Sequence, residues 1–335
     1  MLIISSLSLK SKTKRYLKNP RLQIIKKGFL GNTLVDGTFQ NLYGKSDMST
    51  LYDLLKWKLS SNPQKKIKDN EQYKLKVIKE PSILESKKDY ICWMGHASFL
   101  IQINGKRILT DPCLTAPPLT KRYTELPFPI QDIKPEYLLI SHGHYDHLDS
   151  DTVKHLHHSV ALVPLKMSKL IHKMNPTIIT QEAGWYQRYH IAEDFDIYLL
   201  PAHHWHKRGL ADKDEVLWGS FLIKTKHKSI YFAGDTGYSK HFKDIYKTFG
   251  KIDIAILPIG AYAPRWFMRP SHMNPEEALK AYKDLHAKTL IPMHFGTFDL
   301  SDEPLGEPEQ ILRNIGQRKN IHFLTIGKRS LLHHL

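Results

Sequence analysis

Three histidines and an aspartate fall within six positions, in the run His142-Gly143-His144-Tyr145-Asp146-His147. An apolar run over 137–140 precedes them and predicts a short buried strand, so the polar residues follow where that strand ends. Imidazole nitrogen and carboxylate oxygen are ligand atoms of zinc, iron and manganese. A polar surface loop is the competing interpretation, because the chain holds 20 histidines. Their density at this one place favours a metal site.

The other ligands of such a site should also follow strands, and three later places fit. They are His203-His204-Trp205-His206 after an apolar run, Asp235 between two glycines, and His294 after a further apolar run. Together with the loop they supply five imidazoles and two carboxylates, which suit two metal ions that share one carboxylate. Two divalent ions carry more positive charge than these ligands neutralise, so the site attracts an anionic ester and provides a nucleophile at neutral pH. The pattern therefore predicts hydrolysis of a phosphodiester.

These residues resemble the metallo-β-lactamase superfamily and, within it, the N-acyl-phosphatidylethanolamine-hydrolysing phospholipase D family. The resemblance covers about residues 90–300. Besides the loop it is carried by Trp93–Ser98, Leu109–Pro112, His204-Trp205, Leu217–Ser220, Ala233–Tyr238, Gly260–Met268 and His294–Phe298. It implies an α/β fold, the αββα sandwich, in which two β-sheets pack face to face with helices outside. It also implies two zinc ions, although the ligand types alone admit iron or manganese.

The resemblance assigns a role to each candidate ligand. One zinc ion would be held by His142, His144 and His204, the other by Asp146, His147 and His294, with Asp235 bridging the two ions. His203 remains a competitor of His204, and the histidines at 203 and 206 depart from the family pattern. Asp111 is expected to orient a ligand histidine, although a turn-capping role before Pro112 is an alternative.

Further residues are assigned to the substrate. The resemblance places Tyr145 and His272 at the substrate phosphate, and Asp146, Asp235 and His272 are the predicted catalytic residues. The implied reaction cleaves N-acyl-phosphatidylethanolamine to N-acylethanolamine and phosphatidic acid by a metal-bound hydroxide. A soluble lactonase, or a phosphodiesterase or nuclease acting on a sugar phosphate or nucleic acid, is the alternative. A non-enzymatic lipid- or nucleic-acid-binding module is a third hypothesis, but a structural zinc site needs no such open, seven-ligand arrangement.

The 335 residues divide by composition into two parts. Residues 1–89 are predicted to be a basic N-terminal arm without its own core, with a short helix capped by Ser49 and a charged connector, and residues 90–335 the hydrolase domain. The formal net charge is +16, and residues 1–35 carry eight basic side chains and no acidic one. The arm and the Arg265–Met268 loop are therefore expected to dock on an anionic membrane surface, which is preferred over nucleic acid as the partner.

Composition also bounds the location of the protein. No apolar run is long enough for a membrane span, and the N-terminus lacks the order of charges of a secretory signal, so a cytoplasmic protein peripheral to the membrane is expected. Two cysteines cannot form a disulfide framework. The family resemblance suggests a homodimer.

Periodicity predicts the elements that position the ligands. Strands are expected over 91–94, 98–103, 107–110, 160–163, 178–179, 197–200, 217–224, 229–233, 252–258, 290–293 and 321–326, and helices over 49–59, 151–157, 165–174, 240–249, 275–286 and 307–315. A Pro-rich loop over 112–135 is long enough to face a substrate.

Overall fold

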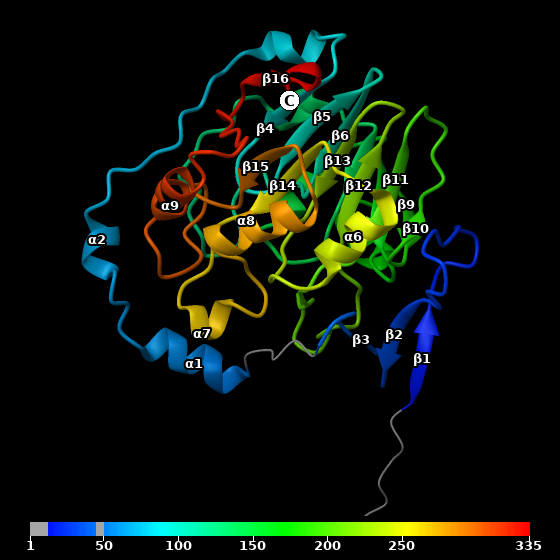
Figure 1. The fold of residues 1–335 in the computed structure, drawn as a ribbon, viewed down its shortest axis with the longest axis horizontal. Coiled ribbons are helices and arrows are strands. Elements are labelled where there is room, and N and C mark those ends of the chain that lie inside the picture. The colour runs from blue at the N-terminus through cyan, green and yellow to red at the C-terminus, as the bar shows by residue number, and fades with distance from the viewer. Residues whose placement is uncertain (1–12, 45–49) are drawn as a thin grey trace, which may run out of the picture.

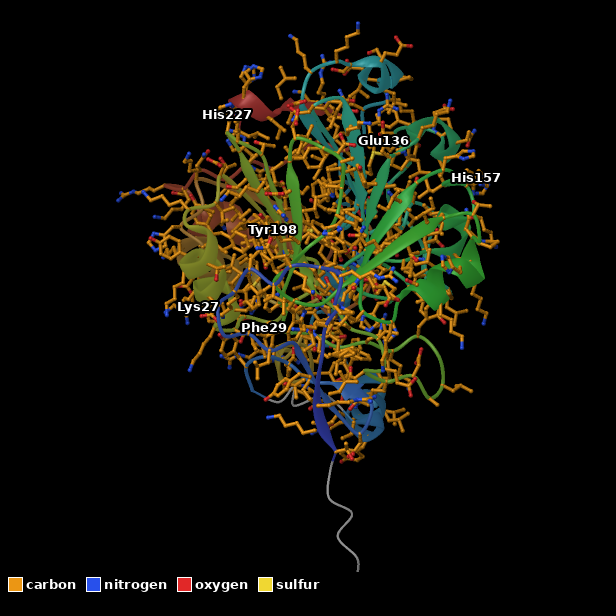
Figure 2. All side chains as sticks on the ribbon, turned by 90° about the vertical axis from the view of Figure 1, so that its right-hand side faces the viewer. Lys27, Phe29, Glu136, His157, Tyr198 and His227 are labelled. Carbon is orange, nitrogen blue, oxygen red and sulfur yellow. The ribbon has the colours of Figure 1, made fainter. Side chains whose placement is uncertain are left out.

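Two mixed β-sheets form the centre of the protein (Figure 1), in a computed structural model that describes residues 13–44 and 50–335. The seven-stranded sheet has the order β16 (Arg329–Leu331), β4 (Tyr90–Trp93), β5 (Phe99–Ile103), β6 (Lys106–Thr110), β7 (Tyr137–Leu139), β8 (Val160–Pro164), β9 (Ile179–Ala183). The six-stranded sheet runs β10 (Gln187–Arg188), β11 (Asp196–Leu200), β12 (Ser220–Lys224), β13 (Ser229–Phe232), β14 (Ile254–Pro258), β15 (Thr289–Met293). Figure 2 shows them as two layers, with Tyr198 of β11 on one and Glu136, beside β7, on the other.

Successive side chains of a strand point to opposite faces of its sheet, and this explains why the sheets have a core on each side. In β4, Ile91 and Trp93 point into the core between the sheets, whereas Tyr90 and Cys92 belong to a second core under the helices of the seven-stranded sheet. A strand that is buried on both faces reads as continuously apolar, as these strands do. The predicted arrangement of two sheets with helices outside is confirmed.

Helices cover the outer faces of both sheets. The elements α6 (His241–Phe249) and α8 (Pro275–Asp284) lie over the six-stranded sheet (Figure 1), and α9 (Glu307–Ile315) follows beside them. On the other side are α3 (Ile130–Ile133), α4 (Ser150–Val153) and α5 (Ser168–Met174). The helix α8 begins as its sequence predicts, because Asn274 caps the backbone N–H of Glu277 and Pro275 occupies the first turn.

Strand direction brings the candidate ligands to one end of the sandwich. The strands β13, β14 and β15 are parallel, and β11 runs in the same direction because β12 is antiparallel to both β11 and β13. The carboxyl ends of these strands therefore share one edge. The turn after β12, marked by His227 in Figure 2, lies at the opposite edge.

The N-terminal segment is built into the fold more closely than an arm would be. Residues 13–44 form a three-stranded antiparallel sheet of β1 (Lys14–Leu17), β2 (Asn32–Val35) and β3 (Thr38–Phe39). Leu22, Leu34 and Phe39 of this segment are buried in the main core between the two large sheets. Lys10, Lys12 and Ser49, named in the sequence analysis, lie outside the described residues.

The connector between this segment and β4 runs along the outside of the molecule (Figure 1). It contains α1 (Leu51–Leu59), α2 (Lys65–Asp69) and the 3-10 helix η1 (Pro81–Glu85). The predicted helix over 49–59 is thus confirmed from residue 51 onward, with Thr50 as its cap. The division at residue 89 into two domains stays a prediction.

Some predicted elements differ from the structure. The strand over 321–326 is wrong, because only isolated bridges form there, between Leu290 and Ile321 and between Val77 and Ile326. The helix over 151–157 is a single turn, α4, which Asp149 caps. The Arg265–Met268 loop is the short helix α7, and the 3-10 helix η2 (Leu332–His334) follows β16. Among the described residues, no helix combines the length and apolarity needed to cross a membrane.

The burial of residues 13–44 predicts their contribution to stability. Leu34 is fully buried, whereas Leu30 is 64% exposed. Leu34→Ala should lower the free energy of unfolding by about 2–5 kcal/mol, because it leaves a cavity in the main core. Leu30→Ala should change it by less than about 0.5 kcal/mol. Urea titrations of both variants test this, and equal, small effects would show that the segment does not share the core.

Candidate metal centre

Three histidine side chains converge at the end of the sandwich where β11 and β13–β15 have their carboxyl ends. His142 and His144 lie in the loop after β7, and His204 follows β11. The His144 Nδ1 atom is 2.9 Å from the His142 Nε2 atom and 3.2 Å from the His204 Nε2 atom. Each side chain offers one nitrogen, and the three nitrogens lie within 4.8 Å of one another. This arrangement suits one metal ion with an open fourth position.

A second group lies beside the first. It contains Asp146, His147, His294 and also His96, whose ligand atoms again lie within 4.8 Å of one another. The Asp146 Oδ2 atom is 3.4 Å from the His147 Nε2 atom and 3.5 Å from the His294 Nε2 atom. Two imidazoles and a carboxylate are a common ligand set for a catalytic metal ion.

Asp235 lies between the two groups. Its Oδ2 atom is 3.2 Å from the His147 Nε2 atom and 4.0 Å from the His204 Nε2 atom, and its Oδ1 atom is 3.0 Å from the His294 Nε2 atom. One carboxylate thus faces nitrogens of both groups, which is the position that a bridging ligand needs. The structure therefore brings together all seven residues predicted to hold metal, while their role as ligands stays a prediction.

Asp111 fixes the orientation of His147. Its carboxylate accepts hydrogen bonds from the Ser141 backbone N–H at 2.7 Å and the Ser141 hydroxyl at 2.6 Å, and it lies 2.7 Å from the His147 Nδ1 atom. The Nε2 atom of His147 is then left free to face the centre. A carboxylate behind a metal-binding histidine fixes the ring and its tautomer in this way. Asp111 lies where its predicted role requires.

The electrostatics of the two groups differ. Burial lowers the pKa of His142 and of His204 well below the usual range and that of His144 to about 3, so these rings are neutral and their nitrogens can donate to a metal. Burial alone would raise the pKa of Asp235, but the neighbouring imidazoles of His147 and His294 outweigh it and hold the pKa well below its usual range. Asp235, between the two groups, is therefore ionised and favours positive charge beside it.

Unpaired polar atoms test whether this centre fits metal ions. Among the described residues, the Nε2 atoms of His147 and His294 and the Oδ1 atom of Asp235 are buried and have no partner in hydrogen-bond geometry, although the last two atoms lie 3.0 Å apart. A buried polar atom left without a partner costs about 1–3 kcal/mol. In the three-histidine group, ring nitrogens of neutral imidazoles lie only 2.9 and 3.2 Å apart. Both features fit a group supplied from outside the chain, and the ligand types match those of divalent transition metals.

The structure separates the neighbouring histidines after β11. His204 joins the three-histidine group, whereas His203 lines a cavity of about 470 Å³ with Tyr238, Arg265 and Arg269. His206 is buried against the loop, where a Cβ atom on residue 143 would overlap its ring. A glycine between the two loop histidines is therefore a packing requirement of His206.

The two predicted substrate residues differ in position. His272 is partly buried, and its Nδ1 atom lies 3.7 Å from the Asp235 Oδ2 atom, so it borders both groups. Tyr145 is 42% exposed, and its hydroxyl donates to the Arg208 carbonyl at 3.0 Å. His272 thus lies at the centre and Tyr145 is more exposed, and the substrate role of each stays a prediction.

Two residues of the centre escaped the sequence analysis as site residues. His96 lies 3.0 Å from Asp146 through its Nε2 atom, and it follows β4 as the predicted ligands follow their strands, which was a usable signal. Asn41 bonds the backbone of His204 at 2.9 and 3.2 Å. Nothing local to Asn41 in the sequence indicates this contact, which spans 163 positions.

The two adjacent histidines give a direct test of the ligand set. His204→Ala should reduce bound metal to about one ion per chain, because it removes one of the three histidines that would hold the first ion. His203→Ala, its matched control, should keep the wild-type metal content. Metal analysis after dialysis measures both, and an equal loss in the His203→Ala protein would contradict the assignment.

Comparison with known proteins assigns the chain to a protein family. Residues 106–295 match the family model described as beta-lactamase superfamily domain. A Caenorhabditis elegans protein named N-acyl-phosphatidylethanolamine-hydrolyzing phospholipase D 1 is 31% identical over 261 residues, which cover 71% of this chain and 73% of that protein. A Saccharomyces cerevisiae protein named N-acyl-phosphatidylethanolamine-hydrolyzing phospholipase D, mitochondrial, is 37% identical over 245 residues, which cover 68% of this chain but only 52% of that protein.

Solved structures agree on the fold. Igni18, described as a metallo hydrolase from Ignicoccus hospitalis, superposes with a TM-score of 0.55 at 23% identity, covering 72% of this chain and 97% of that one. From the family model, the relatives and the ligand geometry together, the chain belongs to the metallo-β-lactamase superfamily as a metal-dependent hydrolase that resembles N-acyl-phosphatidylethanolamine-hydrolysing phospholipase D.

Proposed function

We propose that this protein is a di-zinc phosphodiesterase that hydrolyses N-acyl-phosphatidylethanolamine. The observation that carries the proposal is Asp235, whose carboxylate faces nitrogens of both histidine groups at 3.0–4.0 Å. A shared carboxylate belongs to centres with two ions, which clamp the attacking and leaving oxygens of a phosphoryl group. The names of the two relatives support the choice of lipid substrate.

The reaction exchanges one bond at phosphorus for another. The oxygen of a water molecule joins the phosphorus, and the bond to the ethanolamine oxygen breaks. One proton of that water stays on the new phosphate, the other ends on the alcohol, and the products are phosphatidic acid and N-acylethanolamine. Two bound divalent ions would lower the pKa of water and stabilise negative charge on the phosphate.

The chain's own residues orient the reacting groups. Asp111 holds the His147 ring, and the Ser271 carbonyl lies 3.1 Å from the His204 Nδ1 atom, so each ring presents Nε2 inward. His272 borders Asp235, and a ring N–H of His272 can donate a hydrogen bond to a phosphate oxygen. Tyr145 lies between His144 and Asp146 in the loop and contributes an exposed aromatic ring and a hydroxyl.

Metal content and lipid turnover on the same sample test the function. We expect two zinc ions per chain and hydrolysis of N-acyl-phosphatidylethanolamine in vesicles. Asp235→Asn should lower turnover at least about 100-fold, because it weakens the bridge between the groups. Asp151→Asn, which alters an exposed aspartate, should leave turnover unchanged. Two zinc ions without lipid hydrolysis would exclude this substrate and favour a phosphodiesterase or lactonase with another one.

We also propose that the surface of α1 and α7 docks on an anionic bilayer. The outer side of α1 exposes Tyr52 (72%), Leu55 (51%) and Leu59 (85%), with Lys56 and Lys58 among them. Aliphatic side chains flanked by lysines suit a lipid interface with anionic headgroups, and they do not suit nucleic acid. The cytoplasmic location and the homodimer that the sequence analysis expected stay predictions.

This docking surface is next to the metal centre. Figure 1 shows α1 beside α7, and the rings of Trp57 and Phe267, one from each helix, lie 4.9 Å apart. In α7, Trp266 is 50% exposed, and Arg265 donates to the carbonyl of His272 at 3.0 Å. A bilayer bound at α1 and α7 would therefore present its headgroups near His272.

A negative charge introduced on α1 tests the docking surface. Leu59→Glu should weaken binding to vesicles of anionic phospholipid by about one to two orders of magnitude, because it removes an inserted apolar side chain and adds a repelled charge. Ile179→Glu makes the same kind of change on the edge strand β9, where Ile179 is 67% exposed, and should bind like the wild type. Co-sedimentation measures both, and an equal loss would place the lipid contact elsewhere.

A further inference from the structure

We propose that the N-terminal segment, residues 13–44, is a working part of the metal centre, and that Asn41 is its positioning residue for His204. This inference rests on the proposed role of His204 as a ligand. It concerns residues ahead of the 106–295 stretch that matches the family model. The centre would then be completed by a part of the chain outside the matched domain.

One side chain holds both backbone groups of His204. The Asn41 Nδ2 atom donates to the His204 carbonyl at 2.9 Å, and the His204 backbone N–H donates to the Asn41 Oδ1 atom at 3.2 Å. A carboxamide offers a donor and an acceptor side by side, so it can pair with a residue's main chain as a neighbouring strand would. The backbone of His204 is thereby fixed in both position and rotation.

His204 needs this support because no strand provides it. Residues 201–219, between β11 and β12, have no helix or strand, although His204 itself is fully buried. On the side of its ring away from His144, it is anchored by the Ser271 carbonyl, 3.1 Å from the Nδ1 atom. A metal ligand must be held to within about 0.5 Å of its working position, and loops by themselves are more mobile than that.

Asn41 is in turn held by buried tryptophans. The Trp218 Nε1 atom donates toward the Asn41 Oδ1 atom at 3.3 Å and to the Ala202 carbonyl at 3.1 Å. The Trp185 Nε1 atom donates to the Trp218 carbonyl at 2.6 Å, and the Trp185 backbone N–H donates to the Asn32 Oδ1 atom at 3.1 Å. The N-terminal segment thus contacts this network at two asparagines, one on each side of the tryptophan pair.

A second connection joins β3 to the same loop. The Phe39 backbone N–H donates to the Asp214 carbonyl at 2.7 Å, and the Asp214 carboxylate accepts from the His206 backbone N–H at 3.0 Å. The loop that carries His204 is therefore held on both sides of Trp205 by contacts that lead to the N-terminal segment. Docking of this segment and placement of the ligand are physically coupled.

Cobalt binding to the full-length, metal-free protein tests the proposal without a lipid substrate. Asn41→Ala should lower the Co²⁺ affinity of the three-histidine group about 10- to 100-fold, the usual effect of removing a residue that orients a ligand. It should also change the visible absorption of bound Co²⁺, which reports the coordination geometry. Gln40→Ala is the matched control, because among the described residues the Gln40 amide bonds only to Thr38 and the Phe39 carbonyl, and it should bind Co²⁺ like the wild type.

Asn41→Asp keeps the proposal testable if Asn41→Ala does not fold. It has the same size and keeps the acceptor for the His204 N–H, but it loses the donor to the His204 carbonyl. We expect a loss of Co²⁺ affinity for this variant too, with the melting temperature of the metal-free protein close to that of Gln40→Ala. Wild-type affinity and spectrum in the Asn41 variants would overturn the proposal, and so would an equal loss in Gln40→Ala.

The outcomes also separate this proposal from the proposed function. A wild-type protein that binds no Co²⁺ would refute both. A protein that binds Co²⁺, depends on Asn41 and leaves N-acyl-phosphatidylethanolamine intact would refute only the lipid substrate and support the role of Asn41.

Discussion

Two carboxylates surrounded by imidazoles, one buried and one partly buried, are the constraint on which the rest of the structure depends. Asp146 and Asp235 are held ionised by the histidines around them. A charge taken out of water costs several kcal/mol unless opposite charge and hydrogen bonds compensate it. The imidazoles provide that compensation. They come together because β7, β11, β13 and β15 all end at the same end of the sandwich, and each is followed by a polar residue of the site.

The backbone around the centre is correspondingly strained. Asp111, His96 and His294 have φ values of 32°, 52° and 66°, which non-glycine residues rarely adopt. Such conformations cost about 1–3 kcal/mol each and persist only where the surroundings hold them. Here they are held, because the Asp111 N–H donates to the Leu139 carbonyl and the His294 N–H to the His96 carbonyl. Strain is concentrated where side chains must leave a strand at an unusual angle.

The sequence was most informative where function and local order coincide. The loop at 142–147 and the later residues Asp235 and His294 could be found because each directly follows an apolar strand. The choice between His203 and His204 could not be made from spacing, since both follow the same strand. The role of Asn41 could not be predicted from the sequence, because it depends on a contact across 163 positions. The small sheet of β1–β3 was missed for the same reason, since its apolar residues become interior only against the main core.

The ligand residues come from both sheets, and this has a consequence for the life of the protein. The loop after β7 belongs to the seven-stranded sheet, whereas His204, Asp235 and His294 follow strands of the six-stranded one. Ions bound there would cross-link the two sheets. A ligand present at a hundred times its dissociation constant adds about 2.7 kcal/mol to the stability of the native state. Metal supply would then govern how long the chain survives proteolysis, as well as whether it is active.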